Sequence, residues 1–368
     1  MRSPATARVL ILSDREVAPT ISRCGTYEFE DVACAVDAVE LLLLGESAGR
    51  LARRIERLAP GLFATPARFA RAQPYDLLFL SIHSLPELAR LHPLGRILGL
   101  ARKAVINVDE VWRDELPEHA GDLALLRRFD HVFTPCAGGV EALHQATGRP
   151  ADYLAPSVDA LRFAPRAPGR PRAIDVHWMG RRRAELHHAL RETAEKTERF
   201  YLFDSVQLNP RVSSYVEHRD RLADLVQRTR YFVVDVANSD RPDKTGGQEE
   251  FGPRYMEGAA GGALLVGRAP TSRAFAAQFW SGAVRPLEAD SAAIARVLAE
   301  LEAQPDEIEA LRGRLVAHVL RRHDSVYRWE QILAAAGLEP LPALALRKRQ
   351  LERLAAGFAG EDGESCTA

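Results

Sequence analysis

The feature that most constrains the fold is the alternation of short, continuous apolar runs with longer amphipathic stretches. Four runs rich in Leu, Ile, Val and Phe occupy the first half, at residues 9–12, 77–82, 104–108 and 131–134. Strands that are apolar on both faces are typical of buried parallel sheets. Stretches with helical spacing lie around them, at residues 31–44, 49–58, 85–100, 120–129 and 138–147. This alternation predicts an α/β fold with an open parallel sheet and helices on both faces.

A proline-rich segment, residues 156–172, interrupts the alternation. Proline fits poorly inside a sheet or helix, so this segment is expected to be a linker. Beyond it we expect strands at residues 174–179, 200–203, 231–236 and 263–266. Helices are expected at residues 182–196, 213–228, 253–260, 291–303, 306–322 and 327–336. The chain is therefore predicted to form two Rossmann-like domains, residues 1–155 and 173–335, facing a central cleft, with a C-terminal helix and frayed tail over residues 336–368.

The charge composition limits the classes of partner. Among 368 residues, 49 Lys and Arg nearly balance 50 Asp and Glu, giving a formal net charge of −1. A protein held on nucleic acid by counterion release should carry a basic excess, so no nucleic-acid partner is expected. Only four of the 49 cations are lysine, so a phosphate site here would use arginine. Four scattered cysteines and short apolar runs predict a cytoplasmic protein without a spanning helix.

Residues 249–266, EEFGPRYMEGAAGGALLV, carry the strongest chemical signal. Gly252 permits a turn, and Pro253 suits the first position of a helix. Unpaired N–H groups at a helix start favour an anion such as phosphate. Arg254 in the first turn is disfavoured by the helix dipole unless an anion lies beside it. Glu257 lies one turn further along, where a carboxylate could bind a ribose diol through two hydrogen bonds.

Glu249 and Glu257 form an E-x7-E pair, with Phe251 and Gly252 after the first Glu and a Gly-rich turn after the second. This pattern resembles the signature of retaining glycosyltransferases with the GT-B fold, of the family-4 type. It is most similar to the "glycosyl transferases group 1" branch that includes CgeB-like members, with its R-x-x-E followed by an apolar strand.

Other segments resemble the same family in order and spacing. They are residues 75–84 (YDLLFLSIHS), 104–109 (AVINVD), 129–136 (FDHVFTPC), 153–165 (YLAPSVDALRFAP), 176–181 (VHWMGR) and 323–333 (HDSVYRWEQIL). The matches extend from about residue 75 to 335 and so cover most of the chain.

The resemblance implies a role for each candidate residue. Glu257 would bind the ribose, Phe251, Gly252, Pro253 and Arg254 the diphosphate, and Arg181 after Gly180 the departing phosphate. Glu249 would hold the donor sugar and support the transition state. His83 would reach the donor sugar from the first domain. Glu249 and His83 are thus the catalytic candidates, and the second domain is expected to bind the nucleotide-sugar while the first binds the acceptor.

Two departures from the family pattern matter. The family commonly has a lysine shortly after the Gly-Arg pair, whereas this chain has Arg181-Arg-Arg183, so Arg183 or Lys244 is expected to replace it. The first strand is followed by Ser-Asp-Arg rather than a Gly-rich loop. No D-x-D metal motif follows a strand, so no metal site and no cofactor are predicted beyond the nucleoside-diphosphate-sugar substrate.

The predicted function is transfer of a sugar from that donor to a glycan, lipid-linked or small-molecule acceptor, with retained anomeric configuration, as in polysaccharide biosynthesis. The Arg-rich stretch 49–71 leaves peripheral contact with the inner membrane face as an open alternative. A nucleotide-sugar epimerase of the same architecture and a degenerate nucleotide-sugar-binding protein are the competing readings. The donor base, the sugar, the acceptor and the oligomeric state are not predicted.

Overall fold

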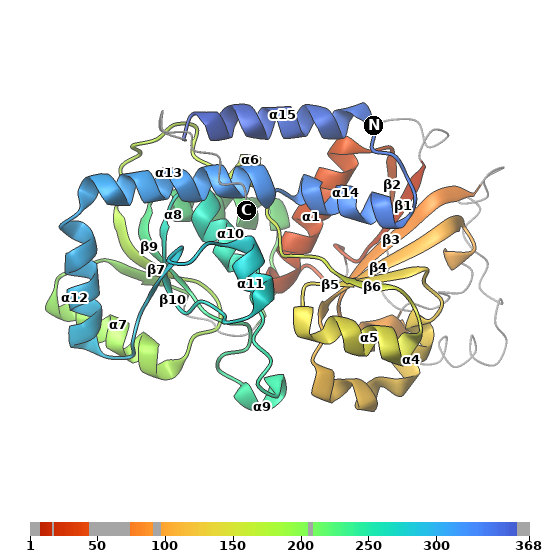
Figure 1. Ribbon diagram of the computed structural model, residues 1–368, viewed down its shortest axis with the longest axis horizontal. Helices are drawn as coiled ribbons and strands as arrows, with labels where there is room; N and C mark the ends of the chain where they lie inside the picture. Colours follow the sequence, from red (N-terminus) through yellow and green to blue (C-terminus); the bar gives the residue numbers. More distant parts are fainter. Residues whose placement is uncertain (1–7, 17, 44–73, 91–96, 205–208, 359–368) are drawn as a thin grey trace. The chain divides into compact units, whose positions relative to one another are not determined.

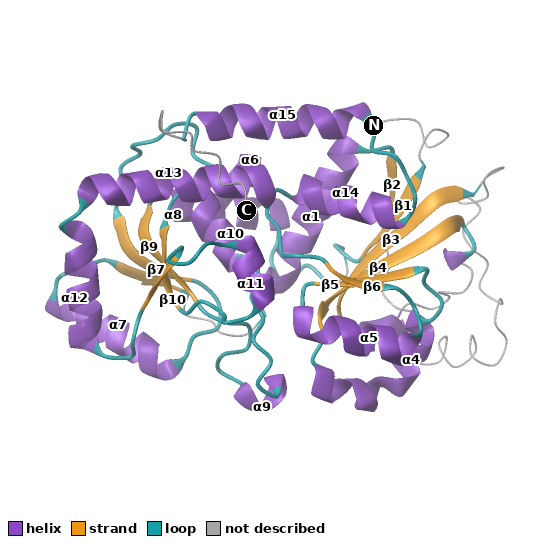
Figure 2. Cartoon of the chain, in the orientation of Figure 1, coloured by secondary structure: helices purple, strands orange, loops and turns teal. Residues whose placement is uncertain are grey.

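The computed structural model describes residues 8–16, 18–43, 74–90, 97–204 and 209–358 (Figure 1). The chain divides into two compact units, with Met1–Ala155 and Trp329–Leu344 in unit 1 and Pro156–Arg328 and Ala345–Ala368 in unit 2. Each unit contains one parallel sheet with helices packed against it (Figure 2). The predicted α/β class is therefore confirmed.

Unit 1 has a six-stranded sheet within the described ranges, in the order β2-β1-β3-β4-β5-β6. Its strands are β1 (Val9–Ser13), β2 (Val39–Leu43), β3 (Tyr75–Ser84), β4 (Ala101–Glu110), β5 (His131–Thr134) and β6 (Ala151–Tyr153). Ile11 in β1 pairs with Leu41 on one side and Phe79 on the other. All five residues of β1 are buried, as expected of a central parallel strand.

Helices cover both faces of the unit 1 sheet. They are α1 (Cys24–Val36), α4 (Ala120–Leu126), α5 (Val140–Thr147) and part of α14 (Ser325–Ala335), with 3-10 turns at Ile21–Arg23, Leu85–Arg90, Arg113–His119 and Ala137–Gly139. Figure 1 shows α1 and α14 on one face and α4 and α5 on the other. Trp329 of α14 is fully buried against Phe79 of β3 and Phe29 of α1, so a segment from the end of the chain completes the core of unit 1.

Unit 2 has a five-stranded sheet in the described ranges, in the order β11-β10-β9-β7-β8. Its strands are β7 (Ile174–Trp178), β8 (Tyr201–Phe203), β9 (Thr229–Val234), β10 (Leu264–Gly267) and β11 (Val284–Pro286). Its helices are α6 (Ala160–Phe163), α7 (Ala184–Lys196), α8 (Tyr215–Gln227), α9 (Pro242–Thr245), α10 (Arg254–Ala260), α11 (Arg273–Gln278), α12 (Ser291–Glu302), α13 (Pro305–Arg322) and α15 (Pro342–Ala356), which begins in unit 1. Helix α7 packs against α12, and α10 against α13.

One predicted helix is wrong. Residues 31–44 were expected to be helical throughout, but α1 ends at Val36 and β2 follows. Asp37 stops the helix in an extended conformation, and its carboxylate accepts hydrogen bonds from Arg8 at 2.8 Å and from the N–H of Ala38 at 2.7 Å. The apolar run after it pairs in register with β1, so it is another buried-sheet strand.

Two further expectations differ from the structure in detail. Residues 85–100 were expected to be one helix, but the segment begins with the 3-10 turn Leu85–Arg90. The expected linker, residues 156–172, contains α6 and groups with unit 2. Asp159 caps α6 by accepting a hydrogen bond from the N–H of Arg162. The Arg-rich stretch 49–71 lies outside the described residues.

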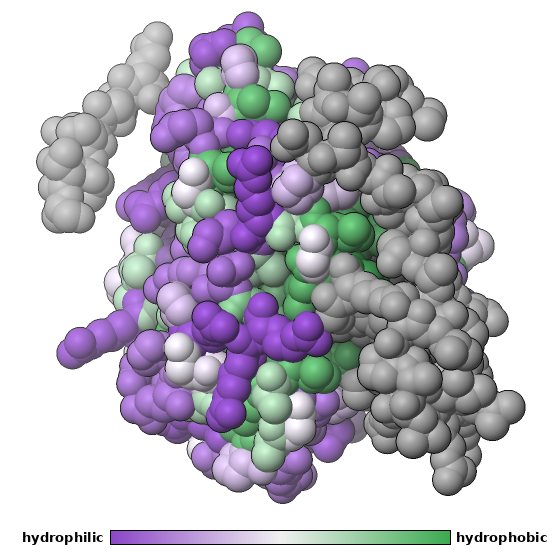
Figure 3. All heavy atoms as spheres, turned by 90° about the vertical axis from the view of Figure 1, so that its right-hand side faces the viewer, coloured by the Kyte–Doolittle hydropathy of each residue, from purple (hydrophilic) through white to green (hydrophobic). Residues whose placement is uncertain are grey.

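The surface mixes polar and apolar side chains. Figure 3 shows hydrophobic residues gathered in a band beside hydrophilic ones on the face that it presents. No helix in the described parts of the chain is long and apolar enough to cross a bilayer.

Candidate functional site

The candidate site residues of unit 2 lie in the loops after its central strands β7 and β9 and in helix α10, which follows the second of these loops. From β7 the chain moves outward to β8 and then back to β9 on the other side of β7. Loops that leave in opposite directions from neighbouring parallel strands open a crevice, the usual ligand position in an open α/β sheet. Gly180 follows β7 and Asp235 follows β9, so two of the loops involved flank this switch point.

The turn after β7 is fixed by Asp204, which directly follows β8. Gly180 has φ of 91°, a conformation that favours glycine, and its N–H donates to the Asp204 carboxylate at 2.9 Å. The buried guanidinium of Arg182 donates to the same carboxylate at 2.6 Å. Arg182 therefore holds the turn in place, which leaves its neighbours as the phosphate candidates.

Arg181 and Arg183 both reach toward the loop after β9. The Nε of Arg183 lies 2.6 Å from Oδ2 of Asp235, whose side chain is 5% exposed. Arg181 donates to the side chain of Asn238, and its Nε lies 3.2 Å from Asp240. The side chains are 44 % and 30 % exposed for Arg181 and Arg183, so both cations remain accessible to an anion at the switch point.

Helix α10 begins at Arg254, one residue later than expected, with Pro253 as its N-cap. Phe251 is buried against the rings of Tyr255 and Phe275, which anchors the loop before the helix. Gly252 lies outside the left-handed region, and a Cβ added to it would meet nothing within 4 Å. Space beside the backbone at this point allows close approach of a ligand.

Glu257 is fully buried, and each of its oxygens faces an arginine. Oε1 accepts a hydrogen bond from Arg219 of α8, and Oε2 from Arg254, both at 2.5 Å. Burial alone would raise the pKa of Glu257, but the charges of Arg254 and Arg219 outweigh it and lower the pKa to about 2. The residue expected to bind ribose is thus an ionised, fully paired carboxylate.

Two histidines lie close to this ion-pair cluster. Burial and, after it, the charge of Arg254 lower the pKa of His177 to about 4, against smaller opposite effects of Asp204 and Glu257. Burial and Arg254 also lower the pKa of His218. Asp204, which holds the turn after β7, and Arg254 of helix α10 both affect the pKa of His177. The turn and the helix therefore lie close enough for their charges to act on the same side chain.

Arg219 and His177 were not among the predicted site residues. Arg219 shares the buried face of α8 with Leu222, Ala223 and Val226. A charged residue at the apolar positions of an amphipathic helix is a sequence signal for a buried ion pair. Its partner on another helix could not be read from the sequence.

Glu249 is held by the loop after β10. Its Oε2 accepts hydrogen bonds from the N–H and the hydroxyl of Thr271, both at 2.9 Å, and its Oε1 pairs with Arg268. The backbone hydrogen bond from Thr271 is the main cause that lowers the pKa of Glu249. The carboxylate is therefore ionised and oriented, with about a fifth of the side chain exposed.

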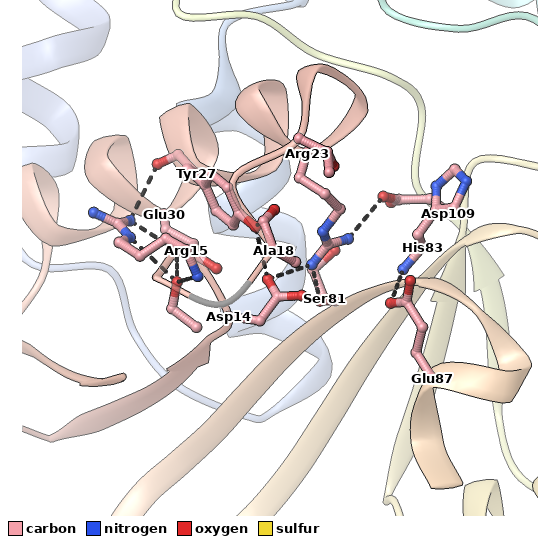
Figure 4. Close-up of polar contacts among 12 residues, drawn as sticks. Asp14, Arg15, Ala18, Arg23, Tyr27, Glu30, Ser81, His83, Glu87 and Asp109 are labelled. Atoms are coloured by element: carbon pink, nitrogen blue, oxygen red, sulfur yellow. Dashed lines mark hydrogen bonds and ion pairs between the residues drawn. The ribbon is translucent and has the colours of Figure 1, made fainter. Parts of the chain in front are cut away.

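In unit 1, His83 lies near the end of β3 (Figure 4). The backbone N–H of His83 donates to the Glu87 carboxylate at 2.9 Å, and the ring Nε2 lies 3.5 Å from Glu110 of β4. The ring is about one-third exposed. The sheet order β2-β1-β3 places the switch point of this unit between β1 and β3, so His83 occupies the corresponding edge of the sheet.

Beside His83 lies a buried cation that sequence reasoning missed. Arg23 donates to Asp14 at 3.0 Å and to the carbonyl of Ser81 at 2.8 Å, and lies 3.5 Å from Asp109 (Figure 4). Burial raises the pKa of Asp109, although the charge of Arg23 lowers it. The hydroxyl of Tyr27 also donates to Asp14. This edge of unit 1 is therefore rich in carboxylates around one arginine.

Lys244, the alternative to Arg183 as a phosphate ligand, lies in the short helix α9. Within the described ranges, no three His, Cys, Asp or Glu side chains gather as a metal site would require.

In a comparison with known families, residues 180–334 match the family described as "Glycosyl transferase-like". The match covers most of unit 2 and includes every site residue predicted for that unit, from Gly180 to Glu257. No curated protein matches the chain.

Comparison with solved structures gives matches over most of the chain. Anabaena HepE, solved with UDP and glucose, has a TM-score of 0.57 and 12% identity, over 90% of this chain and 99% of that one. An alpha-glucosyltransferase solved with UDP and a 13-mer DNA has a TM-score of 0.55 and 11% identity, over 90% and 100%. A glycosyltransferase from Rickettsia africae has a TM-score of 0.50 and 10% identity, over 90% and 97%.

These likenesses confirm the predicted GT-B fold. The family match likens residues 180–334 to glycosyl transferases. The CgeB-like branch, the retained configuration and the site roles stay predictions.

Proposed function

We propose that this protein is a retaining glycosyltransferase that uses a nucleoside-diphosphate-sugar and needs no metal ion for the chemical step. The observation that carries the proposal is the set of arginines around the switch point of unit 2, Arg181, Arg183 and Arg254, beside the Glu257 carboxylate. HepE was solved with UDP and glucose and with UDP-glucose, which favours a UDP-sugar as the donor.

The arginines would act on the leaving group. When the bond to the sugar breaks, negative charge develops on the diphosphate, and fixed cations stabilise that charge most strongly in a site shielded from water. Arg181 and Arg183 are accessible and already oriented by Asp235 and Asn238. Guanidinium forks match phosphate oxygens geometrically, so these residues can supply the charge that a metal ion supplies elsewhere.

Glu249 would act on the sugar. Its carboxylate is ionised and oriented by Thr271, and an ionised carboxylate both accepts hydrogen bonds from sugar hydroxyls and stabilises positive charge that develops on the ring. The retained configuration rests on the spacing of Glu249 and Glu257, which is similar to that of retaining enzymes. His83 of unit 1 would contact the donor sugar.

The acceptor belongs to unit 1 in this proposal and is a glycan, a lipid-linked sugar or a small molecule. The net charge of −1 disfavours a nucleic acid, although one structural neighbour was solved with DNA. Synthesis of a polysaccharide in the cytoplasm is the setting that we propose, with membrane contact as an alternative.

The test is release of nucleoside diphosphate from a panel of UDP-, GDP- and dTDP-sugars, with and without sugar acceptors. We expect release from one donor to depend on an acceptor and to fall at least a hundredfold in Glu249→Gln. Glu309→Gln, an exposed carboxylate on α13 paired with Arg312, is the matched control and should keep full activity.

Product analysis distinguishes the competing functions. A retaining transferase gives a product whose anomeric proton shows the donor's configuration by NMR. Conversion of the donor without any acceptor would point to an epimerase, and nucleotide binding without turnover would point to a binding protein. Either result would overturn the proposal.

A further inference from the structure

The two arginines that bind Glu257 differ in their freedom to move. Arg219 is only 3% exposed at its side chain, and its guanidinium lies 4.7 Å from the ring centroid of Phe163. Arg254 is 27% exposed and belongs to the first turn of α10. If Arg219 left the carboxylate, a buried cation would lose its anion, which is costly. Arg254 can instead reach solvent or an anion, so it is the partner that can be exchanged.

Loss of Arg254 from the pair would not leave Glu257 without a counter-ion. The carboxylate would keep Arg219 on Oε1 at 2.5 Å, while Oε2 would become free to accept hydrogen bonds. An ionised carboxylate oxygen has two lone pairs and can accept from adjacent hydroxyls. The cluster therefore has two arrangements of similar charge balance, one with Arg254 on Glu257 and one with Arg254 on another anion.

The surroundings favour a phosphate as that other anion. His177 and His218 lie near Arg254, and burial and nearby charges lower the pKa of each, so neither adds a competing positive charge at neutral pH. The Nδ1 of His177 is buried without a hydrogen-bond partner in the described protein. A diphosphate offers Arg254 a bidentate partner with more charge than one carboxylate oxygen.

We propose that Arg254 is a donor-responsive latch on Glu257: it holds Oε2 of that carboxylate and leaves it for the diphosphate of an incoming nucleotide, which opens the ribose-binding position. The inference rests on the proposed function, because it needs a nucleoside-diphosphate donor. The contact between Arg254 and the diphosphate then offsets the cost of breaking the Arg254–Glu257 pair. A nucleoside without phosphates makes no such contact, so its affinity is reduced by that cost.

Removal of the Arg254 guanidinium should therefore change the affinities for a nucleoside and for its diphosphate in opposite directions. In Arg254→Met the guanidinium is absent, so Oε2 is free and uridine should bind several-fold more tightly than to the wild type. UDP should bind at least tenfold more weakly, because it loses its charge-assisted contact. An arginine with a purely structural role would change both affinities in the same direction.

The experiment is titration of the wild type and Arg254→Met with UDP and uridine, by calorimetry for UDP and ligand-observed NMR for uridine. If another base binds best in a panel of UDP, GDP, ADP and dTDP, the same comparison uses that diphosphate and its nucleoside. Arg221→Met is the control, since Arg221 forms an exposed ion pair with Glu217 on α8, and both affinities should stay unchanged.

The outcomes separate the latch from the proposed function. If the wild type binds no nucleoside diphosphate, the function itself is wrong. If UDP binds but Arg254→Met weakens both ligands equally, or changes neither, the latch is wrong and the function stands. Circular dichroism checks folding, and Arg254→Gln replaces the Met variant, with the same readout, if that variant does not fold.

Discussion

Arg182 donates hydrogen bonds to both the carboxylate and the backbone carbonyl of Asp204, at 2.6 and 2.5 Å. The guanidinium is almost fully buried, whereas the Asp204 side chain is 29% exposed. The pair joins the turn after β7 to the end of β8 and so sets the position of Gly180, whose N–H binds the same carboxylate. The geometry of the candidate phosphate site therefore depends on Arg182 and Asp204, neither of which was a predicted ligand.

Removal of the Asp204 carboxylate should destabilise unit 2. In Asp204→Ala the buried guanidinium of Arg182 loses its anion, and we expect the free energy of unfolding to fall by about 3 kcal/mol. Urea unfolding measures this loss. Asp220→Ala removes the exposed partner of Arg162 and should change stability by less than about 1 kcal/mol. Similar losses in the two variants would show that burial does not strengthen the Arg182 contact.

Gly252→Ala should separate ligand binding from folding. Its added Cβ meets no protein atom within 4 Å and its φ lies outside the left-handed region, so stability should change by less than about 0.5 kcal/mol. The methyl group would enter the space where the diphosphate is expected, so nucleotide affinity should fall at least tenfold. Thermal unfolding and UDP titration measure the two effects.

Gly180→Ala is the counterpart to this variant. Its Cβ also has open space, but φ of 91° strains any residue other than glycine, which costs about 1–2 kcal/mol. Stability should therefore fall here and not in Gly252→Ala. Unchanged UDP affinity in Gly252→Ala would contradict the assignment of the diphosphate to this loop.

The sequence predicted most strands from their apolar runs, including the three-residue β8, and missed β2, β6 and β11. Strands β3, β4 and β9 have continuous buried runs that stand out from their flanks. Strands β6 and β11 have three residues each, too few for any periodicity, and they are defined by pairing at the edges of the sheets. Their formation depends on neighbours that are distant in sequence, which local pattern cannot reveal.

The sequence named candidate site residues but not their side-chain partners. The sequence indicated Glu257 and Arg254, but Oε1 of Glu257 accepts its hydrogen bond from Arg219, which lies 38 positions earlier. Arg23 likewise meets Asp14 and Asp109 only because β1 and β4 lie in one sheet. The partner of a buried charged residue depends on the tertiary structure. Composition and spacing can therefore identify the charged residue but not the residue with which it pairs.

Gly267→Ala should destabilise unit 2 far more than Gly258→Ala. A Cβ on Gly267 would lie 2.2 Å from the carbonyl oxygen of Val234, at φ of 126°, and a backbone atom of the neighbouring strand cannot give way. A Cβ on Gly258 would approach the side chains of Leu265 and Phe232, which can shift at a cost of about 1–3 kcal/mol. Expression and thermal unfolding compare the two, and equal stability would show that β10 tolerates movement away from β9.

Glu30 should make the stability of unit 1 depend on pH near neutrality. Burial raises the pKa of Glu30 to about 7, although Arg15 and the Ser13 hydroxyl, which bind its Oε2, lower it. Between pH 4.5 and 7 the folded state keeps a proton that the unfolded state has released. The free energy of unfolding contributed by this group therefore falls as pH rises through that window, by up to about 3 kcal/mol.

Glu30→Gln isolates this effect because glutamine cannot release a proton. The difference in free energy of unfolding, variant minus wild type, should increase from pH 5 to pH 7 and level off above it, since the wild type alone loses stability there. Urea unfolding at four pH values measures the difference, and Glu141→Gln on the exposed side of α5 controls for the amide. Parallel curves for Glu30→Gln and the wild type would mean that the buried carboxyl is ionised throughout the window, with Arg15 outweighing the effect of burial.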